Sequence, residues 1–323
     1  MPATRVPTET IVDALQVACR APSLHNSQPW RWVATESGVD LFADPRRMIR
    51  ATDGSGREAL ISCGAVLDHF RVAMAAAGWD TIVRRLPDPA DPLHVAGIDF
   101  AAAPQVTTQQ KVRADAVLLR RSDRLPLAPP HDADGLCGMV GARRGPVRID
   151  IVADDQRSAL SEVSHLSEAT RLYDFDYHSE LYWWTADFIA SDGIPRSALI
   201  SAAESDRVDV GRTFPVTAAP ERRSEVAEDQ ATILVLSTDD DSRESVLRCG
   251  EALSEVLLNA TLAGMATCTV THVTEVPAGR DIVASLVGTT AIPQALVRVG
   301  VAPALTAPPP PTPRRPIHEV FEV

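Results

Sequence analysis

Two stretches of the chain repeat each other at a constant offset of 186 residues, and this repeat constrains the fold more than any other feature of the sequence. Residues 57–78 read REALISCGAVLDHFRVAMAAAG, and residues 243–264 read RESVLRCGEALSEVLLNATLAG. The identical pairs are Arg57/Arg243, Glu58/Glu244, Cys63/Cys249, Gly64/Gly250, Leu67/Leu253, Ala77/Ala263 and Gly78/Gly264. Each segment has apolar residues at helical spacing on more than one face and ends at glycine, which predicts two buried helices.

Short apolar runs flank both predicted helices in the same order. These strand-like runs are VDLFAD (39–44) and LHVAGIDF (93–100) around the first helix, and TILVLS (232–237) and LVRVGVAP (296–303) around the second. Two related units are the simplest account, and chance likeness between two alanine- and leucine-rich helices is the alternative. We expect an α+β fold in which each unit is a mixed sheet packed by helices, with one unit at residues 1–110 and the other at 111–323. The paired central helices would join the units, and a chain that holds both is expected to be a monomer.

Composition excludes several classes of function. The formal charge of −12 argues against binding to a nucleic-acid backbone, which needs clustered cations. No run of 18 apolar residues occurs, and the N-terminal MPATRVPTET lacks the apolar core of a signal peptide, so we expect a cytoplasmic protein with no membrane partner. The five cysteines are spread without metal-ligand spacing, which predicts buried, reduced thiols and no metal site.

The segments between and after the repeated helices are less regular. Residues 126–146 are rich in Pro, Gly and Ala and are predicted to form a surface loop or a short helix. Residues 156–190 have helical patterning. They hold an aromatic cluster, either a core helix or a cover over a flat ligand, made of Tyr173, Phe175, Tyr177, Tyr182, Trp183, Trp184 and Phe188. Residues 191–230 read as a long loop with one short helix, and the proline-rich stretch at 302–313 predicts an extended arm.

A polar turn near the N-terminus is the first candidate for chemistry. The segment ACRAPSLHNSQPWRW (18–32) follows a predicted amphipathic helix that Pro22 ends. Its short polar side chains are Ser23, His25, Asn26 and Gln28. Such a turn suits hydrogen bonding to a planar polar ring, and a purely structural turn is the alternative.

Two arginine-rich segments are the other candidates. LLRRSDRLPL (118–127) is predicted to be extended, so that Arg120, Ser122 and Arg124 share one face. Converging guanidinium groups and a hydroxyl bind a phosphate strongly, and a solvated basic strip is the alternative. TPRRPIHEVF (312–321) holds another arginine pair between prolines.

Together these landmarks resemble those of the FMN-dependent nitroreductases. The likeness rests on APSxxNxQPW, RRSxR, the helix end LLNATLAGMATC, the strand ALVRVGVAP and the tail PRRPIHEV, and over its whole length the chain is similar to the Acg-type members in mycobacteria. The resemblance implies a nitroreductase-like fold. Ordinary members are shorter chains whose homodimers share each FMN site between subunits. Here the polar turn lies in the first unit and both arginine motifs in the second, so we expect one FMN site in an intramolecular pseudo-dimer made by gene duplication.

The resemblance also implies roles for individual residues. Arg120 and Ser122, with Arg314 or Arg315, would hold the FMN phosphate, and Arg124 would be the cation near flavin N1 and O2. The polar turn would contact the ring or the ribityl chain, and the backbone at 269–272 would lie near flavin N5. The expected cofactor-binding residues are Ser23, His25, Asn26, Gln28, Arg120, Arg121, Ser122, Arg124, Thr271, His272, Arg314 and Arg315. The resemblance implies no catalytic acid or base, because hydride moves at N5 and water can supply protons.

One departure from the family pattern leaves three functions open. Only TDDDSRES (238–245) stands where ordinary members insert a long helical excursion, so we expect residues 173–225 to act as a lid. The chain would be an oxidoreductase that passes hydride from NAD(P)H through FMN to a small planar acceptor, such as a nitroaromatic or a quinone. Alternatively, the lid would exclude nicotinamide, and the protein would shield, store or sense FMN. The third function is partner binding without a cofactor.

Overall fold

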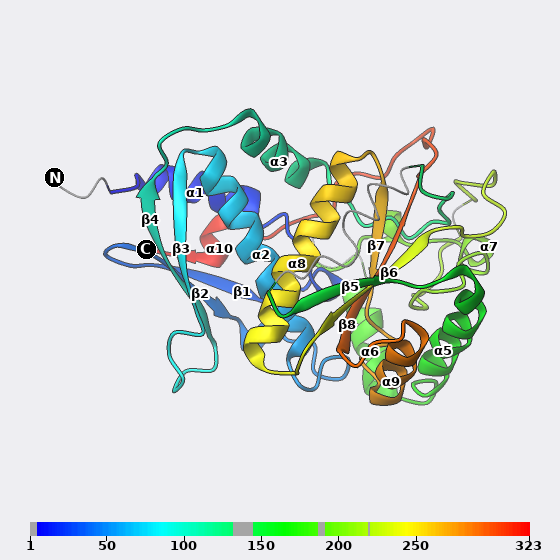
Figure 1. The fold of residues 1–323 in the computed structure, drawn as a ribbon. Helices are drawn as coiled ribbons and strands as arrows, with labels where there is room; N and C mark the ends of the chain where they lie inside the picture. The colour runs from blue at the N-terminus through cyan, green and yellow to red at the C-terminus, as the bar shows by residue number, and fades with distance from the viewer. Residues whose placement is uncertain (1–4, 132–144, 187–190, 219) are drawn as a thin grey trace.

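The computed structural model describes residues 5–131, 145–186, 191–218 and 220–323. It contains two β-sheets with two long helices between them and shorter helices around them, which confirms the α+β class (Figure 1). Cys137, Phe188 and most of the predicted 126–146 loop lie outside the described residues. The boundary between units at residue 110 stays a prediction.

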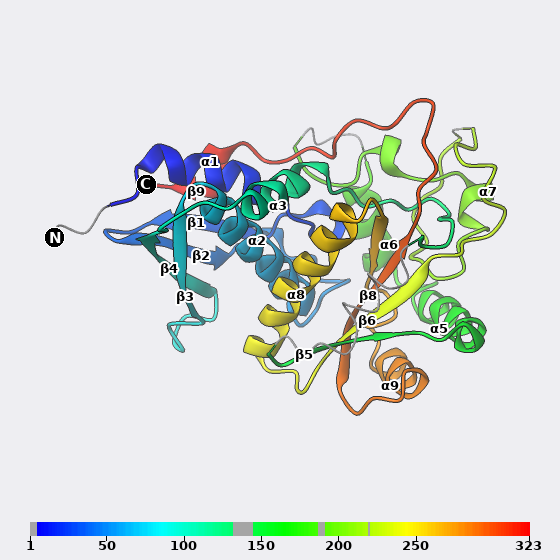
Figure 2. The same ribbon diagram turned by 45° about the horizontal axis from the view of Figure 1, so that its top comes forward.

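The first sheet has five strands in the order β3-β4-β2-β1-β9. Their bounds are β1 Trp30–Ala34, β2 Gly38–Ala43, β3 Trp79–Arg85, β4 His94–Ala102 and β9 Phe321–Glu322. Neighbouring strands are antiparallel except for β9, which runs parallel to β1 with Phe321 opposite Trp32. The end of the chain therefore returns to the sheet formed by its beginning, and Figure 2 shows the C-terminal arm crossing the molecule to reach it.

The second sheet has four antiparallel strands in the order β5-β6-β8-β7. Their bounds are β5 Val147–Ile151, β6 Thr232–Thr238, β7 Ala266–Val270 and β8 Ile292–Gly300. Buried residues of β6 and β8 alternate between two hydrophobic clusters. One cluster joins both sheets through the long helices, and the other packs against two shorter helices on the outer face.

The two long helices are α2 (Arg57–Ala76) and α8 (Arg243–Leu262), and each ends within two residues of the predicted boundary. They cross at Gly64 and Gly250, where a Cβ on either glycine would overlap a backbone carbonyl oxygen of the other helix. The contact is reciprocal, because Gly64 faces the carbonyl of Leu247 and Gly250 faces that of Ile61, a pair with the same offset as the repeat. Such reciprocity is what a two-fold axis produces.

The remaining helices surround the sheets and bring the loops into place. They are α1 Thr8–Ala18, α3 Thr108–Leu119, α5 Arg157–Ala169, α6 Phe175–Trp184, α7 Ala202–Ser205, α9 Pro277–Leu286 and α10 Ile317–Val320. The side chain of Thr107 and that of Gln110 cap the start of α3 reciprocally. Residues 302–316 form no helix or strand, as their proline content predicts.

Two findings concern membranes and thiols. Among the described residues only α2 is long and apolar enough to cross a bilayer, and 78% of its most apolar window is buried inside the protein, as in the core helix of a soluble protein. Cys19, Cys63, Cys249 and Cys268 are buried free thiols, as predicted. No group of metal-binding side chains occurs in the part of the chain that the structure describes.

Candidate functional site

Five arginine side chains line one small cavity, and four of them come from three segments of the chain. Arg20 follows the end of α1, Arg120 and Arg121 follow α3, and Arg314 lies in the C-terminal arm. We call these four residues the arginine cluster. Ser23, Asn26, Ser122 and Arg124 line the same cavity, and no carboxylate side chain of the described residues does.

Arg120 is the most deeply buried member of the cluster. It is 6% exposed, yet the only hydrogen bond from its guanidinium to a described residue runs from Nη2 to the carbonyl oxygen of Arg20, at 3.3 Å. Its Nε and Nη1 have no partner in the part of the chain that the structure describes. Burial, together with the charges of Arg20 and Arg121, lowers the pKa of Arg120 to about 10. A buried cation with unused N–H donors and no counter-charge is an incomplete anion site.

Arg314 joins the arm to the end of α1. It donates from Nε to the carbonyl oxygen of Cys19 at 2.8 Å, and from Nη2 to those of Arg20 and Ala21 at 3.0 and 3.2 Å. Burial and the neighbouring Arg20 and Arg120 lower the pKa of Arg314 well below its ordinary value. The carbonyl groups orient this guanidinium without neutralising its charge, so the cluster stays positive.

A second cavity adjoins the first, and we call it the central cavity. Ser23, Ser122 and Arg124 line both. Its walls come from residues 22–25, one face of α2 around Ser62, residues 268–271 of β7 and the following turn, and the loop from Ile200 to Phe214. Segments from both predicted units therefore enclose it.

The polar turn that lines both cavities has an unusual backbone. His25, Asn26 and Gln28 have φ angles of 49°, 57° and 51°, a region that side chains with a Cβ seldom occupy. Side-chain amides hold the turn in place. Asn26 donates from Nδ2 to the carbonyl oxygens of Gly193 at 2.8 Å and Pro313 at 3.1 Å. The buried Gln28 accepts from the backbone N–H of Arg315 at 2.9 Å. The turn is thus bonded both to Gly193, within the segment 173–225 that was predicted to be a lid, and to the arm.

His25 points into the central cavity as a neutral ring. Burial and the charges of Arg212, Arg124 and Arg171 lower its pKa well below the ordinary value. Both ring nitrogens are buried without a partner among the described residues. Its ring lies 5.7 Å from that of Phe214, edge to face. A neutral imidazole offers one donor and one acceptor to a ligand in the cavity.

Phe214 and Arg212 bring the long loop over the central cavity. The Cζ atom of Arg124 lies 5.0 Å from the centre of the Phe214 ring, within the range of a cation–π contact. Arg212 forms an ion pair with Glu275 and donates to the hydroxyl of Tyr177 at 2.8 Å. The loop residues 200–214, within the predicted lid at 173–225, therefore wall the cavity.

Most of the residues predicted from sequence line these two cavities. They are Ser23, His25, Asn26, Arg120, Arg121, Ser122, Arg124, Thr271 and Arg314. Gln28, His272 and Arg315 do not. The His272 ring is buried against Ser164 of α5, whose Oγ lies 2.8 Å from Nε2, so it faces the outer core. Arg315 bonds within the arm to the carbonyl oxygen of Glu319.

The arginine-rich segment differs from its prediction in one respect. Residues 118 and 119 belong to α3, and the segment is non-helical from Arg120 onward. Ser122 forms an isolated β-bridge with Thr267 of β7. Arg121 also lines the first cavity, so the side chains do not divide between two faces by strict alternation.

The aromatic cluster is neither a core helix nor a cover. Tyr177 is buried, but Tyr173, Phe175, Tyr182 and Trp183 are exposed, and none of the cluster's described members lines the central cavity. The helical spacing of α6 allows only one face to pack, and that face is occupied by Tyr177 and Leu181.

Several residues that line the cavities were not predicted from the sequence, among them Arg20, Glu58, Arg212 and Phe214. Arg20 carried a usable signal, because it lies inside the 18–32 segment next to the helix end. Arg212 and Phe214 lie in an irregular loop whose pattern gives no facing direction.

Comparison with known proteins decides the family. No protein-family model matches the chain. It is 60% identical over 325 aligned residues to "Putative NAD(P)H nitroreductase acg" of Mycobacterium tuberculosis H37Rv, covering 100% of this chain and 98% of the relative. The chain belongs to the nitroreductase family. A second relative of the same organism, also named as an NAD(P)H nitroreductase, is 39% identical over 97% of this chain and 91% of its own length.

Solved nitroreductase structures are more distant from this nitroreductase. The FMN-dependent NfnB of Mycobacterium smegmatis, in complex with NADPH, has a TM-score of 0.43 at 13% identity, covering 67% of this chain and 99% of that one. A nitroreductase with bound FMN from Bacteroides fragilis has a TM-score of 0.38 at 16% identity, covering 59% and 88%.

Proposed function

We propose that this nitroreductase is an FMN-dependent oxidoreductase with one FMN site. The arginine cluster would hold the phosphate, and the central cavity the ring system. The observation that carries the proposal is the buried Arg120 guanidinium, whose Nε and Nη1 have no partner among the described residues. Four other arginines line the same cavity, and no carboxylate of the described residues does. A phosphate supplies the missing acceptors and counter-charge.

The chain's own groups suit the remainder of that ligand. Arg124 lines both cavities and would place its charge between phosphate and ring, while the neutral His25 offers hydrogen bonds without adding charge. Ser62 and Thr271 add hydroxyl groups beside apolar residues of the wall such as Ile61 and Leu253. Bound FMN supplies two-electron chemistry that these side chains lack. The segment around Phe214 would exclude water from the cavity.

The names of the relatives support NAD(P)H as electron donor, and a small planar molecule such as a nitroaromatic or a quinone would be the acceptor. The reciprocal glycine contact between α2 and α8 supports a duplicated chain with both halves of the site in one molecule. We propose that this chain acts as a monomer in the cytoplasm.

The first experiment tests binding of the cofactor. Apo-protein is titrated with FMN and with riboflavin while flavin fluorescence is followed. We expect FMN to bind at one equivalent and about 10- to 100-fold more tightly than riboflavin, as one or two charge-assisted hydrogen bonds to the phosphate would give. The double variant R120A/R124A should be folded and colourless. Stoichiometric flavin in that variant would refute the assignment.

A second candidate function is FMN shielding or storage, and the loop that walls the central cavity favours it. Anaerobic mixing of the FMN-loaded protein with NADH or NADPH distinguishes the two functions. Bleaching of the flavin band within seconds supports the reductase. A flavin that stays oxidised, with FMN still bound, supports storage.

A further inference from the structure

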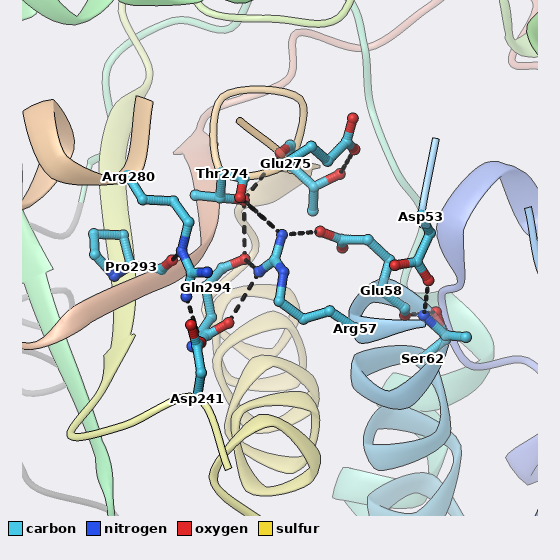
Figure 3. Close-up of polar contacts among 12 residues, drawn as sticks. Asp53, Arg57, Glu58, Ser62, Asp241, Thr274, Glu275, Arg280, Pro293 and Gln294 are labelled. Carbon is cyan, nitrogen blue, oxygen red and sulfur yellow. Dashed lines mark hydrogen bonds and ion pairs between the residues drawn. The ribbon is translucent and has the colours of Figure 1, made fainter. Parts of the chain in front are cut away.

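Another cavity, of about 510 Å³, lies at the N-terminal ends of α2 and α8, and we call it the polar cavity. Residues 51–56, which read ATDGSG, form one wall. Charged side chains line it: Asp53, Arg57, Glu58, Arg171, Asp241, Arg243, Glu275 and Arg280. Figure 3 shows part of this set: Arg57 and Glu58 from α2, Asp241 just before α8, and Arg280 from α9. None of these residues was needed for the proposed FMN site.

Glu58 is the link between this cavity and the central one. Among the described residues, it alone lines both. It lies in the first turn of α2 and is 3% exposed. Its Oε1 is paired with Nη2 of Arg57, and its Oε2 accepts no hydrogen bond from the described residues. Arg57 is itself fixed, donating to the carbonyl oxygens of Gln294 at 2.8 Å and Thr274 at 3.0 Å (Figure 3).

Glu58 is mostly protonated at pH 7 and loses its proton near pH 8. Burial raises its pKa to about 8. Arg57 on the same helix and Arg212 on the loop lower it, whereas the carboxylates of Glu275, after β7, and Asp53, before α2, raise it. Crowded carboxyls of this kind share protons.

Glu275 is not an equivalent carrier, because its charge is compensated. It pairs with Arg212 and with Arg171, whose Nη2 lies 3.3 Å from Oε2. It also accepts a hydrogen bond from Oγ1 of Thr271 at 2.9 Å. Thr271 and Arg212 line the central cavity, so this network forms part of the wall beside Glu58. Glu58 is then the carboxyl that lies between the central and the polar cavity.

We propose that Glu58 is a proton relay that carries a proton from water in the polar cavity to an acceptor bound in the central cavity. The inference rests on the proposed function, because the acceptor needs reducing equivalents. Reduction of a quinone takes a hydride, which NAD(P)H ultimately supplies, and one proton. In the relay step the O–H bond of Glu58 breaks and an O–H bond forms on the acceptor. The carboxylate then regains its proton from water.

The chain offers a matched control for this test. Glu244 occupies the position on α8 that corresponds to Glu58 in the repeat, but its side chain is 56% exposed and pairs with Arg248. The variants E58Q and E244Q therefore remove the same group from equivalent helix positions. FMN affinity is measured first for both variants and the wild type. If the wild type does not bind FMN, the proposed function is refuted, and the proton relay with it.

The first readout is independent of turnover. Infrared spectra of the FMN-loaded, oxidised protein are recorded from about pH 6 to about pH 10, across the pKa of Glu58. We expect a protonated-carboxyl C=O band that disappears near pH 8 in the wild type and in E244Q, and that is missing from E58Q. An unchanged band in E58Q would refute the assignment of the proton to Glu58.

The second readout is the pH profile of acceptor reduction by pre-reduced protein. In the wild type and E244Q, the rate should fall above about pH 8. In E58Q it should be lower by on the order of 10²-fold and lose that fall, the size expected for removal of a positioned proton donor. E58D should have a lower rate than the wild type, and that rate should still decrease as the pH rises. This variant tests the proton relay if E58Q does not fold. FMN-loaded E58Q with wild-type rate and profile would overturn the relay and leave the proposed function intact.

Discussion

Replacing Arg120 with methionine should make the apo-protein more stable while weakening FMN binding. Methionine keeps an unbranched side chain of similar reach and removes the charge. The apo-protein holds this guanidinium 6% exposed, beside Arg20 and Arg121, and no carboxylate of the described residues lines its cavity. A gain in apo-protein stability together with a loss of FMN affinity is expected only if Arg120 belongs to an anion site.

The magnitude follows from the lowered pKa of Arg120. A change from 12.5 to about 10 corresponds to about 3 kcal/mol at ~1.4 kcal/mol per pKa unit. Because the folded-state pKa is below that of the unfolded chain, the cost is present in full below about pH 10 and disappears as the pH rises further. The lost hydrogen bond to the carbonyl of Arg20 offsets about 1 kcal/mol. R120M should therefore gain about 2 kcal/mol at neutral pH.

The assay is urea unfolding of apo-protein in phosphate-free buffer, with and without FMN. The exposed Arg121 in the same cavity provides the control, and R121M should change apo stability by less than about 0.5 kcal/mol. FMN should raise the unfolding midpoint of the wild type more than that of R120M, because binding to the folded state stabilises it. A less stable apo-R120M would refute the argument that this cation lacks its partner.

Three further predictions test the helix crossing, Glu58 and the lid. G64A should lose about 2 kcal/mol of unfolding free energy, because the overlap of its Cβ with a backbone carbonyl on α8 outweighs the ~1 kcal/mol that alanine gains in helix propensity. Urea unfolding measures this loss. G54A is the control and should be nearly unchanged, because the nearest atom to its Cβ would lie 3.6 Å away. Folding raises the pKa of Glu58 from 4.5 to about 8, so the wild type should lose stability relative to E58Q as the pH rises through that window, and lose no more above it. Thermal melts of both proteins over a pH series measure this difference. Melting temperatures that differ by the same amount at every pH would refute the reasoning. F214A should speed flavin reduction by NADPH in anaerobic stopped-flow measurements if the loop limits access, and an equal or slower rate counts against a lid.

The elements with strong periodicity were predictable from the sequence. The helices at 57–78 and 243–264, and the strands beside them, are buried on most sides, so their apolar pattern alone determines their type and extent. The polar turn and RRSDR were predictable as cavity-lining segments because short polar residues and clustered arginines have few other uses beside a core. Their binding of FMN stays a prediction.

The residues that sequence could not place depend on side-chain direction and on contacts made by irregular chain. Thr271 lines the central cavity, whereas the side chain of the next residue, His272, points the other way, toward Ser164 and the outer core. The aromatic residues around Tyr177 look like a core helix in composition, but α6 buries only one face. Phe214 reaches the cavity through a loop that no periodicity describes.

The repeat is symmetric in sequence but not in environment, and this asymmetry argues for one site rather than two. Both long helices begin with Arg-Glu. Glu58 is buried between two cavities, and Arg57 beside it reaches Gln294 of β8. Glu244 is exposed, and Arg243 beside it donates only to the carbonyl of Pro92 among the described residues. A homodimer would give both helix starts the same surroundings. Within one chain each copy can diverge, so one helix start can retain a carboxyl buried between two cavities while the corresponding carboxyl of the other is exposed to solvent.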